Sequence, residues 1–129
     1  MCEKVARYDN LSYICGMKRK IIAFGNYYHE FVRSLNDKER DKLKYLLSLL
    51  ETQDRVPVKF IKLIRDGLYE RRMEYESNIY RIFFIFDEGD IVVLFNCFQK
   101  KTQKTPRKEI NKALQLKADY YEQKRISNL

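Results

Sequence analysis

The chain has 129 residues, of which 45% are hydrophobic and 34% charged, and its formal net charge is +8. This length suits a single domain with one core, and the composition excludes a disordered chain. No apolar run approaches the roughly 20 residues that cross a bilayer, and charged side chains interrupt residues 1–16, where a signal peptide needs an apolar stretch. We therefore expect a cytoplasmic protein with no membrane partner.

The sequence offers no recognisable metal site. Cys2, Cys15 and Cys97 are an odd number of cysteines without metal-ligand spacing, and the single histidine, His29, does not complete a zinc site with them. We expect reduced thiols without a chemical role, an ordinary surface position for His29, no metal and no small-molecule cofactor.

The first residues are expected to lie outside the folded domain. Every patterned segment follows Met17, beginning with a short strand at residues 21–24. We predict an extension over residues 1–16 and one domain over residues 17–129. The alternative, in which residues 1–16 form an arm packed on the domain surface, stays open.

Two helices are predicted next. Apolar residues recur at helical spacing over residues 26–35, with Asn26 as the N-cap candidate. Asn36 precedes Glu39 by three residues, the spacing of a capping box, and opens a second helix over residues 37–52 whose leucines share one face. So short a break between amphipathic helices predicts a helical hairpin that covers a sheet.

Strands and a last helix follow. After Pro57, residues 59–64 are expected to form a short turn of helical character, and Asp66-Gly67 supplies turn chemistry. Polar turns then separate three β-rich runs that predict an antiparallel meander: residues 68–74, 79–86 and 91–98.

The middle of the meander is expected to be buried on both faces, because residues 83–86 and 91–95 are apolar without alternation. The helical hairpin would cover one face and a last helix the other. That helix has Thr105 as its N-cap, Pro106 at its first position and an apolar stripe at Ile110, Ala113, Leu114 and Tyr121. The fold class is therefore α+β, a twisted antiparallel sheet with an N-terminal helical hairpin on one face and a C-terminal helix.

Positive charge is concentrated where the last strand meets the last helix. Residues 99–112 carry six lysines and arginines against one acid, which is +5 of the total +8. Such a local field suits a polyanion, and cations at a helix start oppose the helix dipole, which favours an external anion as their partner. The alternative is a solvated surface without a ligand.

Two of the strands carry ionisable residues inside apolar patterns. The period of two places Leu68, Glu70, Arg72 and Glu74 on one face of their strand and Tyr69, Arg71, Met73 and Tyr75 on the other. Arg81 lies in an apolar run, where an unpaired guanidinium would be costly to bury. We expect either a structural bridge from Arg81 to Glu70 or Glu74, or an arginine that binds phosphate.

Three separated segments together resemble the RelE/ParE superfamily of toxins, in its phage-derived HigB-like branch. They are Gly-Leu-Tyr-Glu-x-Arg at residues 67–72, Tyr-Arg-Ile-Phe-Phe at residues 80–84, and Phe-x-Lys-Lys-Thr-x-Lys-Thr-Pro at residues 98–106. The likeness covers about residues 17–121 and includes the order of the elements. It implies a RelE-like fold and a toxin of a type II toxin–antitoxin system, with mRNA on the ribosome as substrate and a cognate helix-turn-helix antitoxin as partner.

The resemblance also implies a site for endonucleolytic mRNA cleavage, with catalytic positions at Glu70, Arg72, Arg81, Lys100 and Lys101. Attack by a 2′-hydroxyl needs a base, cations for the phosphorane charge and a donor to the leaving oxygen. Glu70 is the candidate base, Arg72 and Arg81 the charge stabilisers, and Lys100 or Lys101 the acid. Contacts with RNA are predicted at Phe98, Gln99, Lys104 and Arg107.

One departure from the family pattern concerns the residues before the lysine pair. Related sequences often have a histidine there, whereas this chain has Phe-Asn-Cys-Phe at residues 95–98. Two alternatives therefore stay open. One is a ParE-like toxin that inhibits DNA gyrase without cutting RNA, and the other is a basic RNA-binding module.

Overall fold

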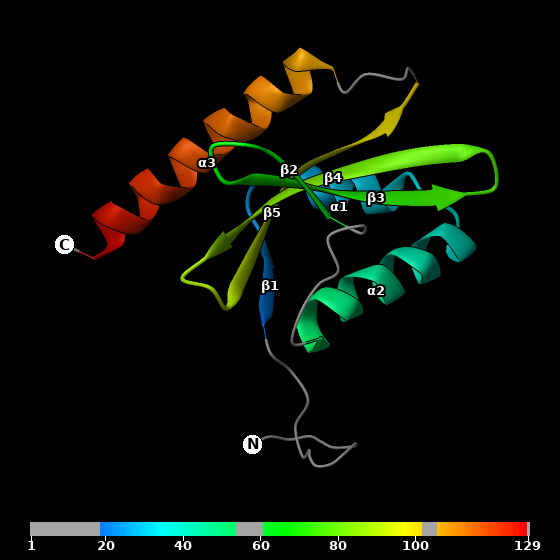
Figure 1. Cartoon of the computed structure of the whole chain (residues 1–129), viewed down its shortest axis with the longest axis horizontal. Coiled ribbons are helices and arrows are strands. Elements are labelled where there is room, and N and C mark those ends of the chain that lie inside the picture. Colours follow the sequence, from blue (N-terminus) through cyan, green and yellow to red (C-terminus); the bar gives the residue numbers. More distant parts are fainter. Residues whose placement is uncertain (1–18, 54–60, 102–105, 129) are drawn as a thin grey trace, which may run out of the picture.

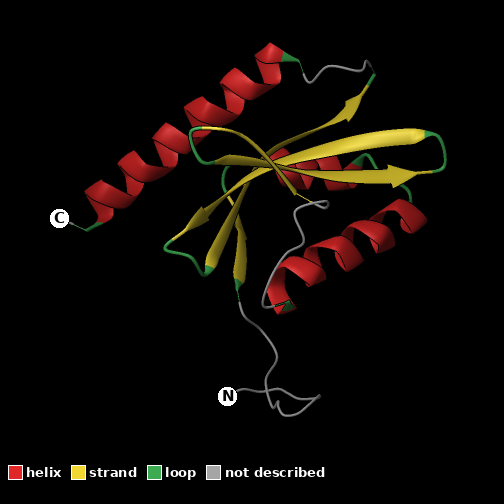
Figure 2. Ribbon diagram, viewed as in Figure 1, coloured by secondary structure: helices red, strands yellow, loops and turns green. Residues whose placement is uncertain are grey.

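The computed structural model describes residues 19–53, 61–101 and 106–128. The predicted extension over residues 1–16 lies outside them, as do Lys104 and Thr105. In chain order the elements are β1 (Lys20–Ala23), α1 (Tyr27–Arg33), α2 (Asp37–Thr52), β2 (Ile61–Arg65), β3 (Leu68–Tyr75), β4 (Asn78–Asp87), β5 (Ile91–Lys100) and α3 (Arg107–Ser127). The α+β class is confirmed (Figure 1, Figure 2).

The strands form one five-stranded sheet in the order β1-β5-β4-β3-β2. The meander β3-β4-β5 is antiparallel as predicted, and β2 extends it as an antiparallel edge strand. The prediction of a purely antiparallel sheet is wrong, because β1 pairs with β5 in parallel. The two helices carry the chain from β1 to β2 at the opposite edge of the sheet, and the antiparallel succession from β2 to β5 then brings β5 beside β1 in the same direction.

Helices cover both faces of the sheet. On one face α1 and α2 pack onto a cluster that includes Leu43, Leu50, Ile82, Phe84 and Val92. On the other, α3 packs onto a cluster that contains Phe83, Ile85, Val93, Phe95 and Ala113. Alternate residues of β4 enter opposite clusters, which confirms that the apolar middle of the meander is buried on both sides.

Three expectations for local structure fail. The described part of residues 59–64 belongs to strand β2 and has no helical character, because Asp66 and Gly67 both take positive φ, as a tight hairpin turn between β2 and β3 requires. The last helix begins at Arg107 with Pro106 in the capping position, one residue later than predicted. Along that helix Tyr120 packs on the core, whereas Tyr121 is 38% exposed.

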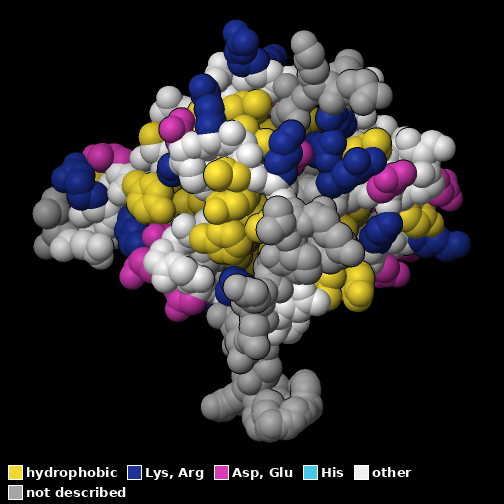
Figure 3. Space-filling model, viewed as in Figure 1, with side chains coloured by type: hydrophobic (Ala, Val, Ile, Leu, Met, Phe, Trp, Pro, Cys, Tyr) yellow, Lys and Arg dark blue, Asp and Glu magenta, His cyan; other side chains and the backbone are white. Residues whose placement is uncertain are grey.

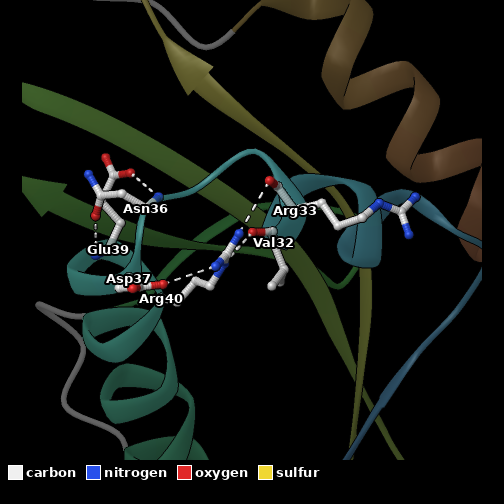
Figure 4. A network of polar contacts seen from close by, with 6 residues as sticks. All are labelled: Val32, Arg33, Asn36, Asp37, Glu39 and Arg40. Atoms are coloured by element: carbon white, nitrogen blue, oxygen red, sulfur yellow. Dashed lines mark hydrogen bonds and ion pairs between the residues drawn. The ribbon is translucent and has the colours of Figure 1, made fainter.

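The turn between α1 and α2 contains the predicted capping box (Figure 4). The backbone N–H of Glu39 donates to Asn36 Oδ1 at 2.8 Å, and the Glu39 carboxylate accepts from the Asn36 backbone at 2.9 Å. Arg40 also donates from Nε to the Val32 carbonyl at 2.9 Å, which satisfies the end of α1. The Tyr80 hydroxyl donates to Glu39 at 2.6 Å and so fixes the start of α2 against β4.

A buried carboxylate fixes α3 against the other face. Asp87, at the end of β4, is 3% exposed and accepts hydrogen bonds from the Tyr120 hydroxyl at 2.6 Å and from Lys124 Nζ at 2.8 Å. Burial alone raises the pKa of Asp87, but the hydrogen bonds from Lys124 and Tyr120 outweigh it and hold the pKa below its ordinary value. The ionised form is therefore the one that stabilises the fold.

We expect Asp87→Asn to lower the free energy of unfolding at pH 7 by about 1–2 kcal/mol, since Lys124 is one-third exposed and water screens its charge. Because the folded pKa is depressed, this stabilisation is present above the unfolded value of about 4 and is lost as pH falls through the folded value. Urea unfolding of both proteins from pH 7 to pH 3 tests this. Glu88→Gln, at the exposed partner of Lys124, is the control, and an equal loss there would contradict the account.

Candidate functional site

Four of the five catalytic residues predicted from the sequence meet on the sheet face that α3 partly covers: Glu70, Arg72, Arg81 and Lys100. In the register, Arg72 lies opposite Arg81 and Arg81 lies opposite Phe98. Lys100 follows Phe98 by two residues, and Glu70 precedes Arg72 by two. Because every second residue of a strand points to the same face, all of these side chains lie on one face of the sheet. Figure 3 shows lysine and arginine side chains gathered over β3 and β4.

The buried pair Glu70–Arg81 forms the floor of this site. Arg81 Nε lies 3.5 Å from Glu70 Oε2, and the two side chains are 11% and 4% exposed. The predicted alternative bridge to Glu74 does not form, because Glu74 pairs with Arg72 at 2.9 Å in a much more exposed position. Arg81 Nε is buried and has no hydrogen-bond partner among the described residues. At this atom, Arg81 and Glu70 therefore form an ion pair without a hydrogen bond.

Lys100 lies half-buried at the end of β5, within the electrostatic field of the same cluster. Burial lowers the pKa of Lys100, the charges of Arg81, Lys62 and Arg72 lower it as well, and Glu70 acts in the opposite direction. An ammonium that is partly desolvated and surrounded by other cations releases its proton more readily than one in water. This environment therefore eases the release of the Lys100 proton.

Lys62 belongs to this cluster although the sequence reading did not include it. It lies on β2 directly opposite Glu70, so it shares the sheet face of the cluster, and it is exposed. The sequence pattern predicts a turn of helical character over residues 59–64, which gives Lys62 no place on a sheet face. The signal that would have revealed it is the Asp66-Gly67 turn, which implies a strand on each side. We call the set Lys62, Glu70, Arg72, Arg81 and Lys100 the basic cluster.

The remaining predicted site residues lie around the basic cluster or away from it. Phe98 is half-buried with its ring 5.5 Å from that of Phe83, so it closes the edge of the core beside Lys100. Gln99 lies on the opposite face, where it donates to Asn78 at 3.0 Å. Lys101 and Arg107 are exposed at the end of β5 and the start of α3.

The described residues offer little support for metal or thiol chemistry. They contain no group of three or more histidine, cysteine or acidic side chains arranged for a metal ion. His29 is exposed on α1, and burial raises the pKa of the Cys97 thiol, which makes it a poor nucleophile. Among the described helices, none is long and apolar enough to cross a membrane.

A comparison with protein families places most of this chain in one family. A search of curated proteins gives no match. The family described as Phage derived protein Gp49-like (DUF891) matches residues 30–118, a range that contains α2, the whole meander and the first half of α3. All five residues of the basic cluster lie within that range. The chain belongs to the phage-derived Gp49-like family.

Proposed function

We propose that this protein is the toxin of a type II toxin–antitoxin system, and that it cuts mRNA on the ribosome in the manner of RelE and HigB. The observation that carries the proposal is the basic cluster, in which four cations share one sheet face with a single buried carboxylate. Such a face attracts phosphate through several charges at once. Membership of the Gp49-like family, which is RelE-like, supports the same conclusion.

The proposed reaction is attack of a 2′-hydroxyl on the adjacent phosphorus, with departure of the 5′-oxygen. Arg72 and Arg81 stabilise the charge that develops on the phosphorane oxygens. Lys100 donates a proton to the leaving 5′-oxygen, for which its lowered pKa suits it. Lys62 and Lys101 hold the neighbouring phosphates, and Arg107, Lys104 and Phe98 contact the RNA beside the cut.

Glu70 receives a different role from the one the sequence suggested. Its side chain is only 4% exposed and it is ion-paired with Arg81, so a 2′-hydroxyl has little access to it. We assign it as a positioning residue that holds the Arg81 guanidinium toward the phosphate. The protein then supplies charge stabilisation and a proton donor, and the 2′-hydroxyl proton passes to water. The ribosome contributes by aligning the message, since positioning alone can supply several kcal/mol.

A labelling experiment in growing cells tests the class of activity. On induction of the full chain we expect incorporation of labelled amino acids to stop before incorporation of labelled thymidine. A ParE-like inhibitor of gyrase would reverse this order and produce DNA breaks first. A basic RNA-binding module would leave messages intact, so primer extension on abundant transcripts is the second readout, and unbroken messages would contradict the nuclease assignment.

A further inference from the structure

Two adjoining cavities are lined by residues of α1 and α3. The larger has a volume of about 600 Å³ and the smaller a volume of about 470 Å³. Tyr27 and Glu30 line both cavities and so form a common wall between them. We call the two cavities together the acidic groove. Both volumes are in the range of small-molecule binding sites.

The α3 side of the acidic groove is one stripe of the helix. Residues three or four apart share a helix face, and the stripe follows this spacing through Glu109, Lys112, Leu116, Asp119 and Gln123. Glu109 and Asp119 are ten residues apart in the chain, which separates them by about 15 Å along the helix axis. The groove is therefore elongated and suits a long ligand better than a compact one.

The acidic groove is locally negative, although the chain as a whole has a formal net charge of +8. Four carboxylates line it: Glu30, Glu109, Asp119 and Glu122. Lys112 is the single cation among the described residues of the lining. Arg125 lies outside the lining and pairs with Glu122 at 2.5 Å, so three carboxylates remain against one ammonium. The local field therefore attracts cations and disfavours RNA.

Neutral amides, rather than cations, hold these three carboxylates. The hydrogen bonds run from Asn26 Nδ2 to Glu30 at 3.1 Å, from Asn96 Nδ2 to Glu109 at 2.9 Å, and from Gln115 Nε2 to Asp119 at 3.0 Å. None of the three carboxylates forms an ion pair with another described residue. An amide fixes the direction of a carboxylate and leaves its charge uncompensated. Each carboxylate is therefore oriented for a cation from outside the chain.

A buried acceptor in the lining points to the same kind of ligand. Asn96 lines the smaller cavity and is 2% exposed. Its Nδ2 donates to the backbone carbonyl of Glu109 at 3.1 Å as well as to the carboxylate, and two acceptors at this atom fix the orientation of the amide. The other polar atom, Oδ1, is buried and has no hydrogen-bond partner among the described residues. A ligand with N–H groups supplies the donor that this atom lacks.

The chain itself places an alkylammonium at the common wall. Lys112 Nζ lies over the Tyr27 ring, 4.2 Å from its centroid. The face of an aromatic ring attracts a cation through the ring quadrupole. Lys112 therefore occupies the position that an ammonium of a ligand would take between the two cavities.

We propose that the acidic groove binds a linear aliphatic polyamine, in which methylene segments separate several ammonium groups. The ammonium groups pair with the three carboxylates that neutral amides hold, and one of them donates to Asn96 Oδ1. The methylene segments pack on the apolar part of the lining, which includes Phe24, Tyr27 and Leu116. This inference goes beyond the proposed function and does not depend on it.

Two other cationic ligands fit less well. A divalent metal ion needs converging ligands, and the described residues contain no group of three or more acidic, histidine or cysteine side chains arranged for one. A polyamine needs no such convergence, because its charges are spread along its length. A lysine-rich segment of another protein would extend beyond the cavities, over the exposed Arg107 and Lys108 that precede Glu109, and these cations would repel it.

Isothermal titration calorimetry of spermine into the full chain at low ionic strength tests the proposal. We expect binding that is tighter for the tetraamine spermine than for the diamine putrescine, because the shorter molecule reaches fewer carboxylates. Glu30→Gln and Asp119→Asn should each weaken spermine binding by about two- to fivefold. Asp41→Asn is the matched control, at an exposed carboxylate of α2 outside the groove, and should leave the affinity unchanged.

Lys112→Met should have the opposite effect. Methionine keeps an unbranched apolar stem and removes the ammonium from the Tyr27 ring, so a ligand ammonium can take its place. Spermine affinity should therefore rise by about two- to fivefold. In NMR spectra of the natural chain, the side-chain amide signals of Asn96 should shift on addition of spermine, which places the ligand in the smaller cavity.

Three results would overturn this inference. They are a natural chain that does not bind spermine, equal weakening by Asp41→Asn and Glu30→Gln, and Asn96 signals that stay unshifted at saturating spermine. A hexalysine peptide that binds where spermine does not would also contradict it and would point to a protein partner. Circular dichroism checks that each variant is folded. Because neither RNA nor ribosomes are present, failure here leaves the proposed function standing, and intact messages in the cell leave this inference standing.

Discussion

Replacing Arg81 by alanine is expected to lower the free energy of unfolding by about 3–5 kcal/mol and to abolish toxicity. The reason is the burial of the ion pair, because the Arg81 and Glu70 side chains are only 11% and 4% exposed. The same guanidinium is assigned to stabilise the phosphorane, so stability and activity fall together. Urea unfolding and a growth assay measure the two losses.

Two matched variants separate the structural role of Arg81 from its chemical role. Arg72 is 49% exposed and pairs with the exposed Glu74, so Arg72→Ala should cost less than about 1 kcal/mol of stability and still reduce cleavage. The double variant Arg81→Met with Glu70→Gln removes both buried charges and should recover most of the stability without activity. Arg81→Ala with unchanged stability would show that the ion pair does not support the fold.

Replacing Lys100 by arginine should reduce cleavage by about 10²–10⁴-fold while the fold and RNA binding persist. Arginine keeps the positive charge but does not release a proton at accessible pH. In the natural protein, the rate should decline as pH rises through the lowered pKa of Lys100, below its ordinary value, because only the ammonium can act as the acid. Single-turnover cleavage from pH 6 to pH 10 measures this decline.

If the decline in rate at high pH disappears in Lys100→Arg, the group that titrates is Lys100. Lys101→Arg is the matched control, since Lys101 is exposed at the end of β5 and its role is electrostatic. Full activity of Lys100→Arg would remove Lys100 as the acid and leave a purely electrostatic site. If the variant keeps the decline in rate at high pH, another group is responsible for it.

Most of the site was predicted from the alternation of side chains between the two faces of a strand. In β3 the period of two placed Glu70 and Arg72 on one face, and the cost of burying Arg81 correctly predicted a carboxylate partner for it. The choice between Glu70 and Glu74 depended on the register of two strands, which the sequence alone does not specify. The structure shows Glu70 under Arg81 and Glu74 beside Arg72.

The failures have a common physical origin in contacts between distant segments. The parallel pairing of β1 with β5 joins two segments that are far apart in the chain, and no local pattern predicts it. Lys62 was missed because Ile-Lys-Leu-Ile-Arg at residues 61–65 does not alternate strictly, and the ladder between β2 and β3 has an irregularity at Leu63–Arg65. In α3 the buried stripe passes through Ala113, Leu116 and Tyr120, and Tyr121 lies outside it.

The most direct test of the central claim is cleavage of a short message on purified ribosomes. We expect new 5′ ends inside the message with ribosomes present and none with free RNA, while gyrase supercoiling in a parallel reaction is unaffected. Lys62→Ala, in the basic cluster, should slow cleavage, and Lys38→Ala, exposed on α2, should not. Intact messages together with inhibited gyrase would contradict the assignment of this face to RNA cleavage.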